Sequence, residues 1–367
     1  MHFTIQREAL LKPLQLVAGV VERRQTLPVL SNVLLVVQGQ QLSLTGTDLE
    51  VELVGRVQLE EPAEPGEITV PARKLMDICK SLPNDALIDI KVDEQKLLVK
   101  AGRSRFTLST LPANDFPTVE EGPGSLTCTL EQSRLRRLIE RTSFAMAQQD
   151  VRYYLNGMLL EVSTATLRAV ATDGHRLAMC SMSADIGQAD RHQVIVPRKG
   201  ILELARLLTE PDGTVSIVLG QHHIRATTGE FTFTSKLVDG KFPDYERVLP
   251  KGGDKLVLGD RQALREAFSR TAILSNEKYR GIRLQLAAGQ LKIQANNPEQ
   301  EEAEEEISVD YNGASLEIGF NVSYLLDVLG VMTTEQVRLI LSDSNSSALL
   351  QEADNDDSSY VVMPMRL

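Results

Sequence analysis

The motif with the clearest potential for chemistry is Asp173-Gly174-His175-Arg176, which places a carboxylate two residues from an imidazole. An aspartate so placed can orient a histidine for general acid–base catalysis. A polar turn at the end of a strand has the same composition, and an internal repeat of the chain carries Asp48-Leu49-Glu50 at the equivalent place, without a histidine. The turn is the favoured interpretation, so the sequence predicts no catalytic residue here.

A second candidate is the pair His222-His223. Neighbouring residues of a strand point to opposite faces, so these imidazoles cannot share a metal ion without help. The chain lacks the GxxxxGK, GxSxG and HExxH motifs, the commonest signals of a phosphate loop, a hydrolase and a zinc protease. Gly122-Pro123-Gly124 is interpreted as a linker, because no helix follows to supply an anion-binding N-terminus. The sequence predicts no metal and no cofactor.

Composition sets the broad class of the protein. The 367 residues include 39 Lys and Arg against 50 Asp and Glu, a formal net charge of −11, and the length predicts two or three domains. That bulk charge argues against a conventional basic nucleic-acid-binding protein. No apolar run has the length of a membrane helix, and the N-terminus lacks the order of a signal peptide. Cys79, Cys128 and Cys180 lie among apolar neighbours, which predicts small core residues in a reduced, cytoplasmic protein.

Internal repetition is the strongest signal in the chain. Val33–Val37 with Leu42–Asp48 is echoed by Met158–Val162 with Leu167–Asp173, and again by Ile282–Leu286 with Leu291–Asn297. The period is about 125 residues, too long for a solenoid repeat, so each copy is predicted to be a domain. Turn-rich stretches at 121–124 and 250–254 predict domains of residues 1–124, 125–252 and 253–367.

Each copy is predicted to contain a strand, a helix, a run of strands, a second helix and further strands. The first helix of copy one is marked by an apolar stripe, Leu10, Leu11, Leu14, Val17, Ala18 and Val21, with a bend or late start expected at Pro13. The equivalent faces are Leu135, Leu138, Ile139 and Thr142, and Leu264, Ala267, Phe268 and Thr271. Second helices are expected over 74–82, 201–208 and 324–331. The predicted class is α+β, with two helices packed on an antiparallel sheet in each domain.

Basic residues concentrate on these predicted helices. Five of the six carry net positive charge in an acidic chain, and Arg134, Arg137 and Arg141 recur at i, i+3 and i+7, a stripe separate from the apolar one. For any single helix, a solvated face rich in Lys and Arg is the ordinary interpretation. The shared sign of five helices favours contact with a phosphate backbone, which is electrostatic and independent of base sequence.

The two ends of the chain carry opposite charge. Residues 299–306 hold six carboxylates and run into Ile307, which predicts an ordered acidic edge strand in the last domain. Lys96, Lys100, Arg103 and Arg105 predict a basic edge in the first domain. Edges of opposite charge pair head to tail, and such an interface closes into a ring where its rotation permits.

Six motifs spread over the whole chain carry a family resemblance: Thr47–Glu50, Gln149–Gly157, Ala171–Leu177, Phe233–Gly240, Asn296–Glu302 and Tyr360–Leu367. They resemble the bacterial DNA polymerase III beta subunits, the sliding clamps. The resemblance implies three DNA-clamp domains per chain and a head-to-tail homodimeric ring around duplex DNA, with helices lining the hole. It also implies a processivity factor of DNA replication that has no catalytic site of its own and acts in the cytoplasm, associated with the nucleoid.

The resemblance also implies which residues act. Sequence-independent DNA contacts would come from Arg24, Arg73, Gln149, Tyr153, Tyr154 and Lys199. The two tyrosines, on a predicted loop beside Arg152, would stack on exposed bases, with core packing as the alternative. The homodimer interface would set Lys74, Lys96, Arg103, Arg105 and Phe106 against Ile273, Leu274, Glu299, Glu301, Glu302, Glu304 and Glu305.

A peptide pocket is implied as well, for short motifs of the replicative polymerase catalytic subunit, the clamp loader, other polymerases and repair proteins. Its matching residues are Leu155, Thr172, Gly174, His175, Arg176, Leu177, Pro243, Arg247, Val248, Val361, Met363, Pro364 and Met365. Apolar walls with adaptable methionines suit several different ligands. Asn345 departs from the family pattern, which would make that edge of the pocket more polar.

Two classes of function remain open: a clamp closed around DNA, and a non-enzymatic peptide-binding scaffold whose basic helices never contact DNA. Salt dependence distinguishes them. Only the clamp requires weak binding to linear DNA that falls with salt, together with stable retention on circular DNA after loading.

Overall fold

The structure is a computed structural model that describes residues 1–22, 27–119, 122, 124–186 and 191–366. Its elements form three runs of the same order, each a strand, a helix, four strands, a helix and three strands. The α+β class and the repeated order of elements predicted from the sequence are therefore confirmed.

The elements of the first run are β1 (His2–Gln6), α1 (Arg7–Val20), β2 (Asn32–Gln38), β3 (Gln41–Thr47), β4 (Val51–Gln58), β5 (Gly66–Pro71), α2 (Ala72–Ser81), β6 (Leu87–Asp93), β7 (Lys96–Ala101) and β8 (Ser104–Ser109). The second run comprises β9 (Gly124–Glu131), α3 (Gln132–Glu140), β10 (Gly157–Val162), β11 (Thr166–Thr172), β12 (Arg176–Ser183), β13 (His192–Pro197), α4 (Arg198–Leu207), β14 (Thr214–Gly220), β15 (His223–Thr228) and β16 (Phe231–Lys236). The third comprises β17 (Lys255–Asp260), α5 (Arg261–Thr271), β18 (Gly281–Ala287), β19 (Gln290–Asn296), β20 (Glu302–Ser308), β21 (Leu316–Asn321), α6 (Val322–Val331), β22 (Gln336–Leu341), β23 (Ala348–Glu352) and β24 (Asn355–Val362).

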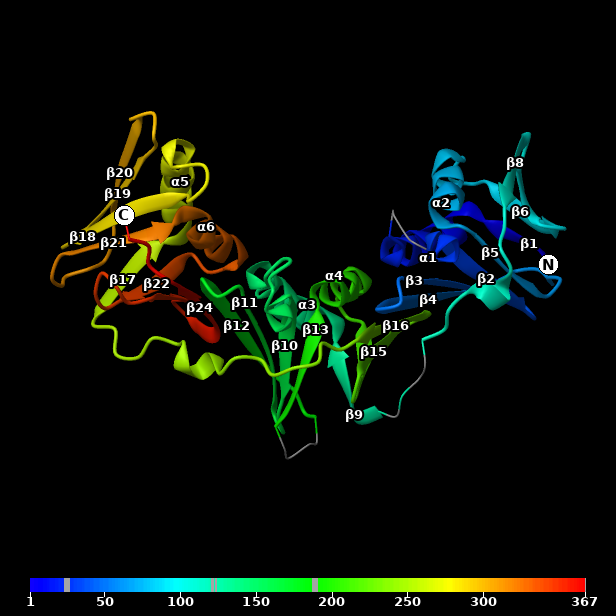
Figure 1. Cartoon of the computed structure of the whole chain (residues 1–367), viewed down its shortest axis with the longest axis horizontal. Helices are drawn as coiled ribbons and strands as arrows, with labels where there is room; N and C mark the ends of the chain where they lie inside the picture. Colours follow the sequence, from blue (N-terminus) through cyan, green and yellow to red (C-terminus); the bar gives the residue numbers. More distant parts are fainter. Residues whose placement is uncertain (23–26, 120–121, 123, 187–190, 367) are drawn as a thin grey trace. The chain divides into compact units, whose positions relative to one another are not determined.

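By its internal packing the chain forms two compact units, Met1–Leu135 with Lys199–Leu237, and Arg136–Arg198 with Val238–Leu367. The first unit holds an eight-stranded sheet of order β5-β2-β3-β4-β16-β15-β14-β9 and a four-stranded sheet of order β1-β6-β7-β8. The second holds an eight-stranded sheet of order β13-β10-β11-β12-β24-β23-β22-β17 and a four-stranded sheet of order β20-β19-β18-β21. Successive runs therefore meet inside the large sheets, at the antiparallel pairs β4–β16 and β12–β24 (Figure 1).

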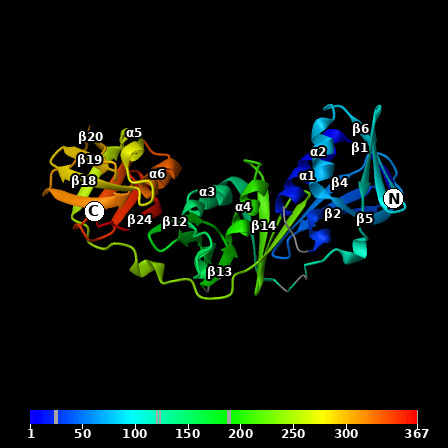
Figure 2. The ribbon, with the colours of Figure 1, turned by 45° about the horizontal axis from the view of Figure 1, so that its top comes forward.

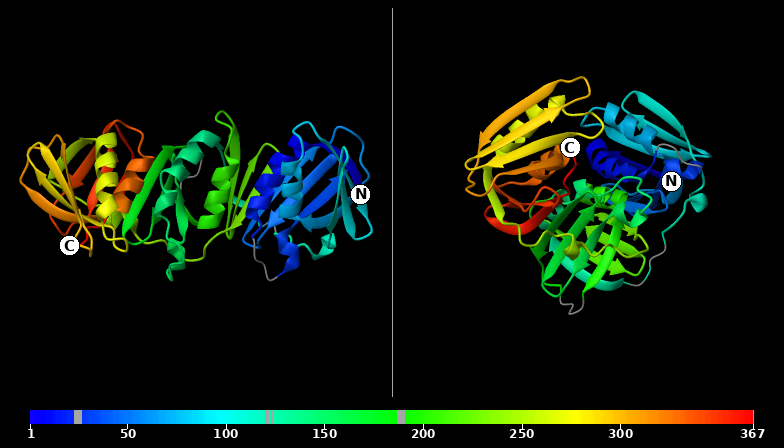
Figure 3. Two further views of the ribbon diagram at one scale, coloured as in Figure 1. Left: turned by 90° about the horizontal axis from the view of Figure 1, so that it is seen from above. Right: turned by 60° about the vertical axis from the view of Figure 1, so that its left-hand side comes forward.

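The helices lie in pairs on the sheets. In the first unit α1 and α2 pack against each other and over the strands β2 to β5. In the second unit α5 and α6 lie side by side, α5 over β19 and β20 and α6 beside β21 (Figure 2). The pair keeps this arrangement in both views of Figure 3, where α5 is yellow and α6 orange.

The predicted apolar stripes are the faces that these helices bury. Of the six stripe residues of α1, five are buried and Leu11 is half-buried, whereas every residue predicted for the second and third copies is buried. The late start considered at Pro13 is wrong, because α1 begins at Arg7 and continues through Pro13. Gly55 on β4 makes room for that ring, since a Cβ at Gly55 would lie 3.2 Å from the Cβ of Pro13. The second helices begin earlier than predicted, directly after the strands that precede them.

The charged sheet edges are only partly as predicted. The acidic run forms β20, which is the outer strand of its four-stranded sheet, so the ordered acidic edge is confirmed. The basic edge needs a correction, because Lys96 and Lys100 lie on the inner strand β7. The chain reverses at Gly102, where φ is +56°, and this hairpin makes β8, with Arg105, the edge strand.

Two further expectations concern the interior and the membrane. Cys79, Cys128 and Cys180 are buried and unpaired, as expected of small core residues, and burial raises the pKa of Cys79 to about 11. Within the described part of the chain, no helix is long and apolar enough to cross a bilayer.

Candidate nucleic-acid and peptide interfaces

The helices from α1 to α5 each carry more basic than acidic residues, whereas the only charged residue of α6 is Asp327. Arg73 on α2 and Arg137 on α3 are exposed. Arg24, the first of the predicted DNA contacts, lies outside the described residues. The described helices thus present basic side chains of the kind that contacts phosphates without reading base sequence.

Arg141 is not part of this basic surface, so the predicted stripe of Arg134, Arg137 and Arg141 is wrong at its last member. Helix α3 ends at Glu140, and Arg141 turns inward, where its side chain is 3% exposed. Its guanidinium donates two hydrogen bonds to Glu352, of 2.7 and 2.9 Å. Burial opposes ionisation of Glu352, but the bonds from Arg141 and Thr333 outweigh it and lower the pKa of that carboxyl. Arg141 therefore belongs to a buried ion pair and is not available to contact a DNA phosphate.

Lys199 is near the start of α4 and already has two partners. Its Nζ lies 2.9 Å from Glu22 Oε1 and also bonds Asp48 Oδ2. Burial disfavours the charged form, yet the bonds to Asp48 and Glu22 raise the pKa of Lys199, so it is a cation. Its charge is shared with two carboxylates of the same unit.

The predicted tyrosines lie on a short 3-10 turn, Tyr153–Leu155. Tyr153 is 57% exposed, while Tyr154 is half-buried against the core. The two rings meet edge to face with centroids 5.9 Å apart. Gln149 is exposed and has φ +56°, in the segment that leads to this turn. The exposed ring of Tyr153 is thus available to stack on a base, whereas the half-buried Tyr154 shows the core packing named as the alternative.

The predicted peptide pocket begins at the turn that joins β11 to β12. Thr172 Oγ1 donates to the carbonyl of Arg176 at 2.6 Å and accepts the Gly174 N–H, while Asp173 Oδ1 accepts the N–H groups of His175 and Arg176. Gly174 has φ +89°, a conformation that side-chain-bearing residues rarely adopt. These bonds leave His175 exposed at the tip, and its carbonyl accepts the N–H of Met363 at 3.0 Å.

An apolar floor lies next to this turn. Its buried core is Leu159, Val170, Leu177, Ile195, Phe242, Tyr245 and Val361, with Tyr154, Val248 and Leu349 among the partly buried residues packed against it. Of the predicted residues, Leu155, Leu177 and Val361 are buried, whereas Val248 is half-buried and Met363 is 39% exposed. Leu177 and Val361 are register partners across β12–β24. The structure thus gathers three of the predicted pocket residues, Leu177, Val248 and Val361, around one apolar cluster of the second unit.

Two grooves of the second unit are lined in part by predicted pocket residues. One of about 470 Å³ is lined by Arg247, Val248, Leu249, Pro250 and Ile340, among others. The other, of about 380 Å³, includes Met365, Arg366 and Asn345. Leu249, Pro250 and Ile340 of the first groove were not predicted. They belong to the segment between the second and third runs and to β22, and neither carries a recognisable motif.

Arg176 does not point into this surface. Its guanidinium bonds Asp173 Oδ2 at 3.1 Å and Asp327 Oδ2 at 2.5 Å. It also lies over the rings of Phe144 and Tyr324, 5.2 and 4.5 Å from their centroids. Such stacking and pairing fixes a guanidinium firmly. Arg176 therefore holds the turn and α6 together.

The loop that carries Pro243, Arg247 and Val248 is anchored by a residue that sequence reasoning missed. Tyr245 is 2% exposed, and its hydroxyl lies 3.1 Å from Glu161 Oε1. Arg191 and Gln193 also bond this carboxylate, at 2.5 and 2.6 Å. Burial raises the pKa of the Tyr245 phenol, while the surrounding donors lower the pKa of Glu161. No pattern around Glu161 signals this role, because its partners come from distant parts of the chain.

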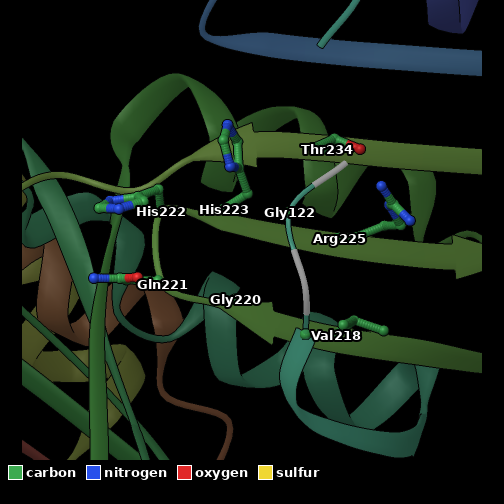
Figure 4. A pocket seen from close by; sticks show the side chains of 9 residues that line it. Gly122, Val218, Gly220, Gln221, His222, His223, Arg225 and Thr234 are labelled. Carbon is green, nitrogen blue, oxygen red and sulfur yellow. The ribbon is translucent and has the colours of Figure 1, made fainter. Parts of the chain in front are cut away.

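The candidates for catalysis have other roles in the structure. Asp173 is engaged by two backbone N–H groups and by Arg176, so it does not orient the imidazole of His175. His222 and His223 line a cavity of about 100 Å³ with Arg225 and Thr234, and their rings point in different directions (Figure 4). The positive charges of Arg225 and nearby Lys236 oppose a bound cation. Across the described residues, no group of three His, Cys, Asp or Glu side chains could hold a metal ion.

Comparisons with known proteins agree over the whole chain. The DNA polymerase III beta subunit family matches in three parts, its N-terminal domain over residues 1–120, its central domain over 129–244 and its C-terminal domain over 246–366. The chain is 96% identical to the beta sliding clamp of Pseudomonas putida, 88% to that of Pseudomonas aeruginosa and 57% to that of Escherichia coli, with 100% of both chains covered each time. It is similar to the crystal structure of the Pseudomonas aeruginosa beta subunit, with TM-score 0.97 and 88% identity, and to Caulobacter crescentus pol III beta, with TM-score 0.93 and 40% identity, both over 100% of each chain.

Proposed function

Because the chain belongs to the DNA polymerase III beta subunit family and is a sliding clamp of DNA replication, we propose that two copies close head to tail around duplex DNA. The observation that carries this proposal is the pair of four-stranded sheets that end in β8 and β20. Each is half of the eight-stranded sheet that successive runs build elsewhere in the chain.

The internal repeat predicts which strands pair when the half-sheets of two copies meet. In the large sheets the fourth strand of one run pairs with the last strand of the next, as β4 with β16 and β12 with β24. The third run has β20 as its fourth strand, and the first run has β8 as its last. An antiparallel pair of β20 from one copy with β8 from a second copy therefore completes a third large sheet. Two such joints close a ring of two chains.

The registers of the existing joints predict the register of the new one. Phe233 is paired with Leu53 across the first joint, and Tyr360 with Ala178 across the second. The equivalent residues are Phe106 on β8 and Ala303 on β20, and the next pair in this register is Arg105 with Glu304. An aromatic residue opposite an aliphatic one, flanked by opposite charges, is a favourable cross-strand arrangement. The other interface residues inferred above, including exposed Ile273 and half-buried Leu274 beside β20, would contribute at its margins.

The basic helices then supply the contact with DNA. Phosphate contacts from Arg73 and its neighbours would be independent of base sequence and would weaken with salt, which allows sliding. Tyr153 would stack on exposed bases. The ring acts as a subunit of a polymerase holoenzyme and needs no catalytic residue, metal or cofactor of its own.

The apolar surface around Leu177, Val248 and Val361 is the proposed dock for short peptides of the polymerase, the clamp loader and repair proteins. Its floor is preformed by buried side chains, while Met363 and Met365 adapt to different ligands. One such site per chain gives two per ring. We assign the clamp domains to residues 1–124, 125–252 and 253–367, and the place of action to the cytoplasmic nucleoid.

Mass in solution tests the assembly. The clamp predicts sedimentation at twice the 40.5 kDa of the chain. A monomer at micromolar concentration would leave the peptide-binding scaffold as the alternative, because an open chain cannot be retained on circular DNA.

A further inference from the structure

Lys199 is placed between two carboxylates that differ in burial. The side chain of Asp48 is 5% exposed and that of Glu22 is 52% exposed, while Lys199 itself is 28% exposed. All three residues belong to the same compact unit. One ammonium thus faces two negative charges, one in the interior and one at the surface.

The pairing with Asp48 is structural. Asp48 Oδ1 accepts the N–H groups of Glu50 and Val51 at 2.9 and 2.7 Å, which leaves Oδ2 for Lys199. The equivalent turn of the second run is built alike, since Asp173 Oδ1 accepts two backbone N–H groups and Oδ2 accepts Arg176 Nε. A buried carboxylate requires a countercharge. The charge of Lys199 is therefore already balanced before Glu22 is considered.

Glu22 makes the local charge negative. It contacts Lys199 at 2.9 Å from the solvent side, and an exposed ion pair of this kind is weak and readily exchanged. A DNA phosphate that approaches Lys199 must replace Glu22 or meet its repulsion. The equivalent position of the first run, Arg73 on α2, is exposed, and that of the third run is the neutral Ser323. At this position the first repeat therefore has an exposed arginine, the second has a lysine paired with Glu22, and the third has no cation.

We propose that Glu22 attenuates DNA contact at Lys199, holding the clamp's grip on the phosphate backbone weak enough for sliding. The inference rests on the proposed function, because it refines how the basic helices meet DNA. Lys199 contacts a phosphate only when that phosphate replaces the Glu22 carboxylate. Arg73 can bind a phosphate without displacing a carboxylate of this kind.

The test compares Glu22→Gln with Glu8→Gln in the full-length dimer. Glu8 is also exposed and lies on the first turn of α1, so both variants change the net charge equally. Affinity for a short fluorescent duplex is measured by anisotropy over a range of salt concentrations. Glu22→Gln is expected to tighten binding about two- to fivefold at low salt and to steepen the slope of log K against log salt by about 0.9. Glu8→Gln should change both quantities less.

A second background removes the cation without leaving a buried charge. In Asp48→Asn/Lys199→Gln the buried pair is replaced by neutral amides, and thermal melting confirms that the variant is folded. Glu22→Gln added to this background should have no more effect than Glu8→Gln. Equal effects of the two glutamate variants in the wild-type background, or an undiminished effect of Glu22→Gln without Lys199, would overturn the inference. Salt-independent binding by the wild type would instead overturn the proposed function itself.

Discussion

Arg141 and Glu352 form a two-bonded ion pair in the interior of the second unit, with side chains 3% and 0% exposed. The pair joins the end of α3 in the second run to β23 in the third. Thr333 adds its N–H and hydroxyl to the same carboxylate, and Ser358 accepts a further bond from Arg141. The arginine predicted to contact DNA instead ties two repeats together.

Breaking this pair should destabilise the protein strongly. Glu352→Gln leaves the Arg141 guanidinium buried without a countercharge, which costs about 3–5 kcal/mol in comparable cases. The free energy of unfolding, measured with urea, should fall accordingly. The double variant Arg141→Met/Glu352→Leu removes both charges and should recover most of the loss. A Glu352→Gln variant as stable as the wild type would contradict this role.

The same carboxylate makes stability depend on pH. The pKa of Glu352 is below its ordinary value of 4.5 in the folded protein, so the unfolded chain binds its proton more readily. The stability it confers is present above that ordinary value and is lost as pH falls through the lower folded pKa. Unfolding free energies between neutral pH and about pH 3 should show a smaller acid loss in Glu352→Gln than in the wild type. Identical pH profiles would show that Glu352 does not contribute.

The repeated architecture could be predicted from the sequence, because hydrophobic periodicity and motif spacing are local properties that need no knowledge of distant contacts. Leu135, Leu138 and Ile139 are buried because their spacing places them on one face of a helix, the face that packs against the sheet. The sequence failed where the partner is distant in the chain. Arg141 continues the spacing of Arg134 and Arg137, yet the helix ends before it, and its partner is 211 residues away. The contact between Glu161 and Tyr245 was not predicted for the same reason, since the two residues are 84 positions apart.

The proposed peptide site shows the same contrast between what local motifs predict and what distant partners decide. Motif resemblance named Leu177, Val248 and Val361, which the structure gathers around one cluster. It placed Arg176 in the pocket, whereas the guanidinium binds Asp327 and lies over Tyr324. A motif identifies residue types at positions, but the direction of a long side chain depends on partners from other elements.

The proposed joint between copies can be tested by charge exchange. Arg105→Glu places a carboxylate opposite Glu304 in the inferred register, and like charges directly opposite are unfavourable. Analytical ultracentrifugation should show an increased fraction of monomer, and Arg105→Glu/Glu304→Arg should restore the dimer. Arg283→Glu, on the second-unit strand β18, is the matched control and should leave the mass unchanged. Failure of the exchanged pair to restore the dimer would contradict the register.

Apolar contacts at the same interface give an independent test. Ile273 is 75% exposed in the isolated chain, and Ile273→Asp with Leu274→Asp should yield monomers by sedimentation. The exposed Leu256 on β17 gives a control, because Leu256→Asp should keep the dimer. A dimer unchanged by the double variant would remove these residues from the interface.

The proposed peptide site is tested at its C-terminal methionines and at Tyr245, which anchors its loop. Deleting residues 363–367 removes the methionines of the site and should abolish binding of a polymerase-derived peptide in a fluorescence assay. Tyr245→Phe removes only the hydroxyl that bonds Glu161, and should weaken peptide binding about threefold to tenfold, since a buried hydrogen bond is worth about 1 kcal/mol. Tyr279→Phe, at an exposed tyrosine, should have no effect. Undiminished affinity after the deletion would place the site elsewhere.

Encirclement of DNA is the central claim, and retention on DNA of different topology tests it most directly. Fluorescent protein is loaded by its clamp loader onto a nicked circular plasmid, the loader is removed, and the bound fraction is followed before and after a single restriction cut. A closed ring predicts persistence on the circle and rapid loss once the cut provides ends from which the ring slides off. Equally fast loss from circular and linear DNA, or persistence after the cut, would contradict the account.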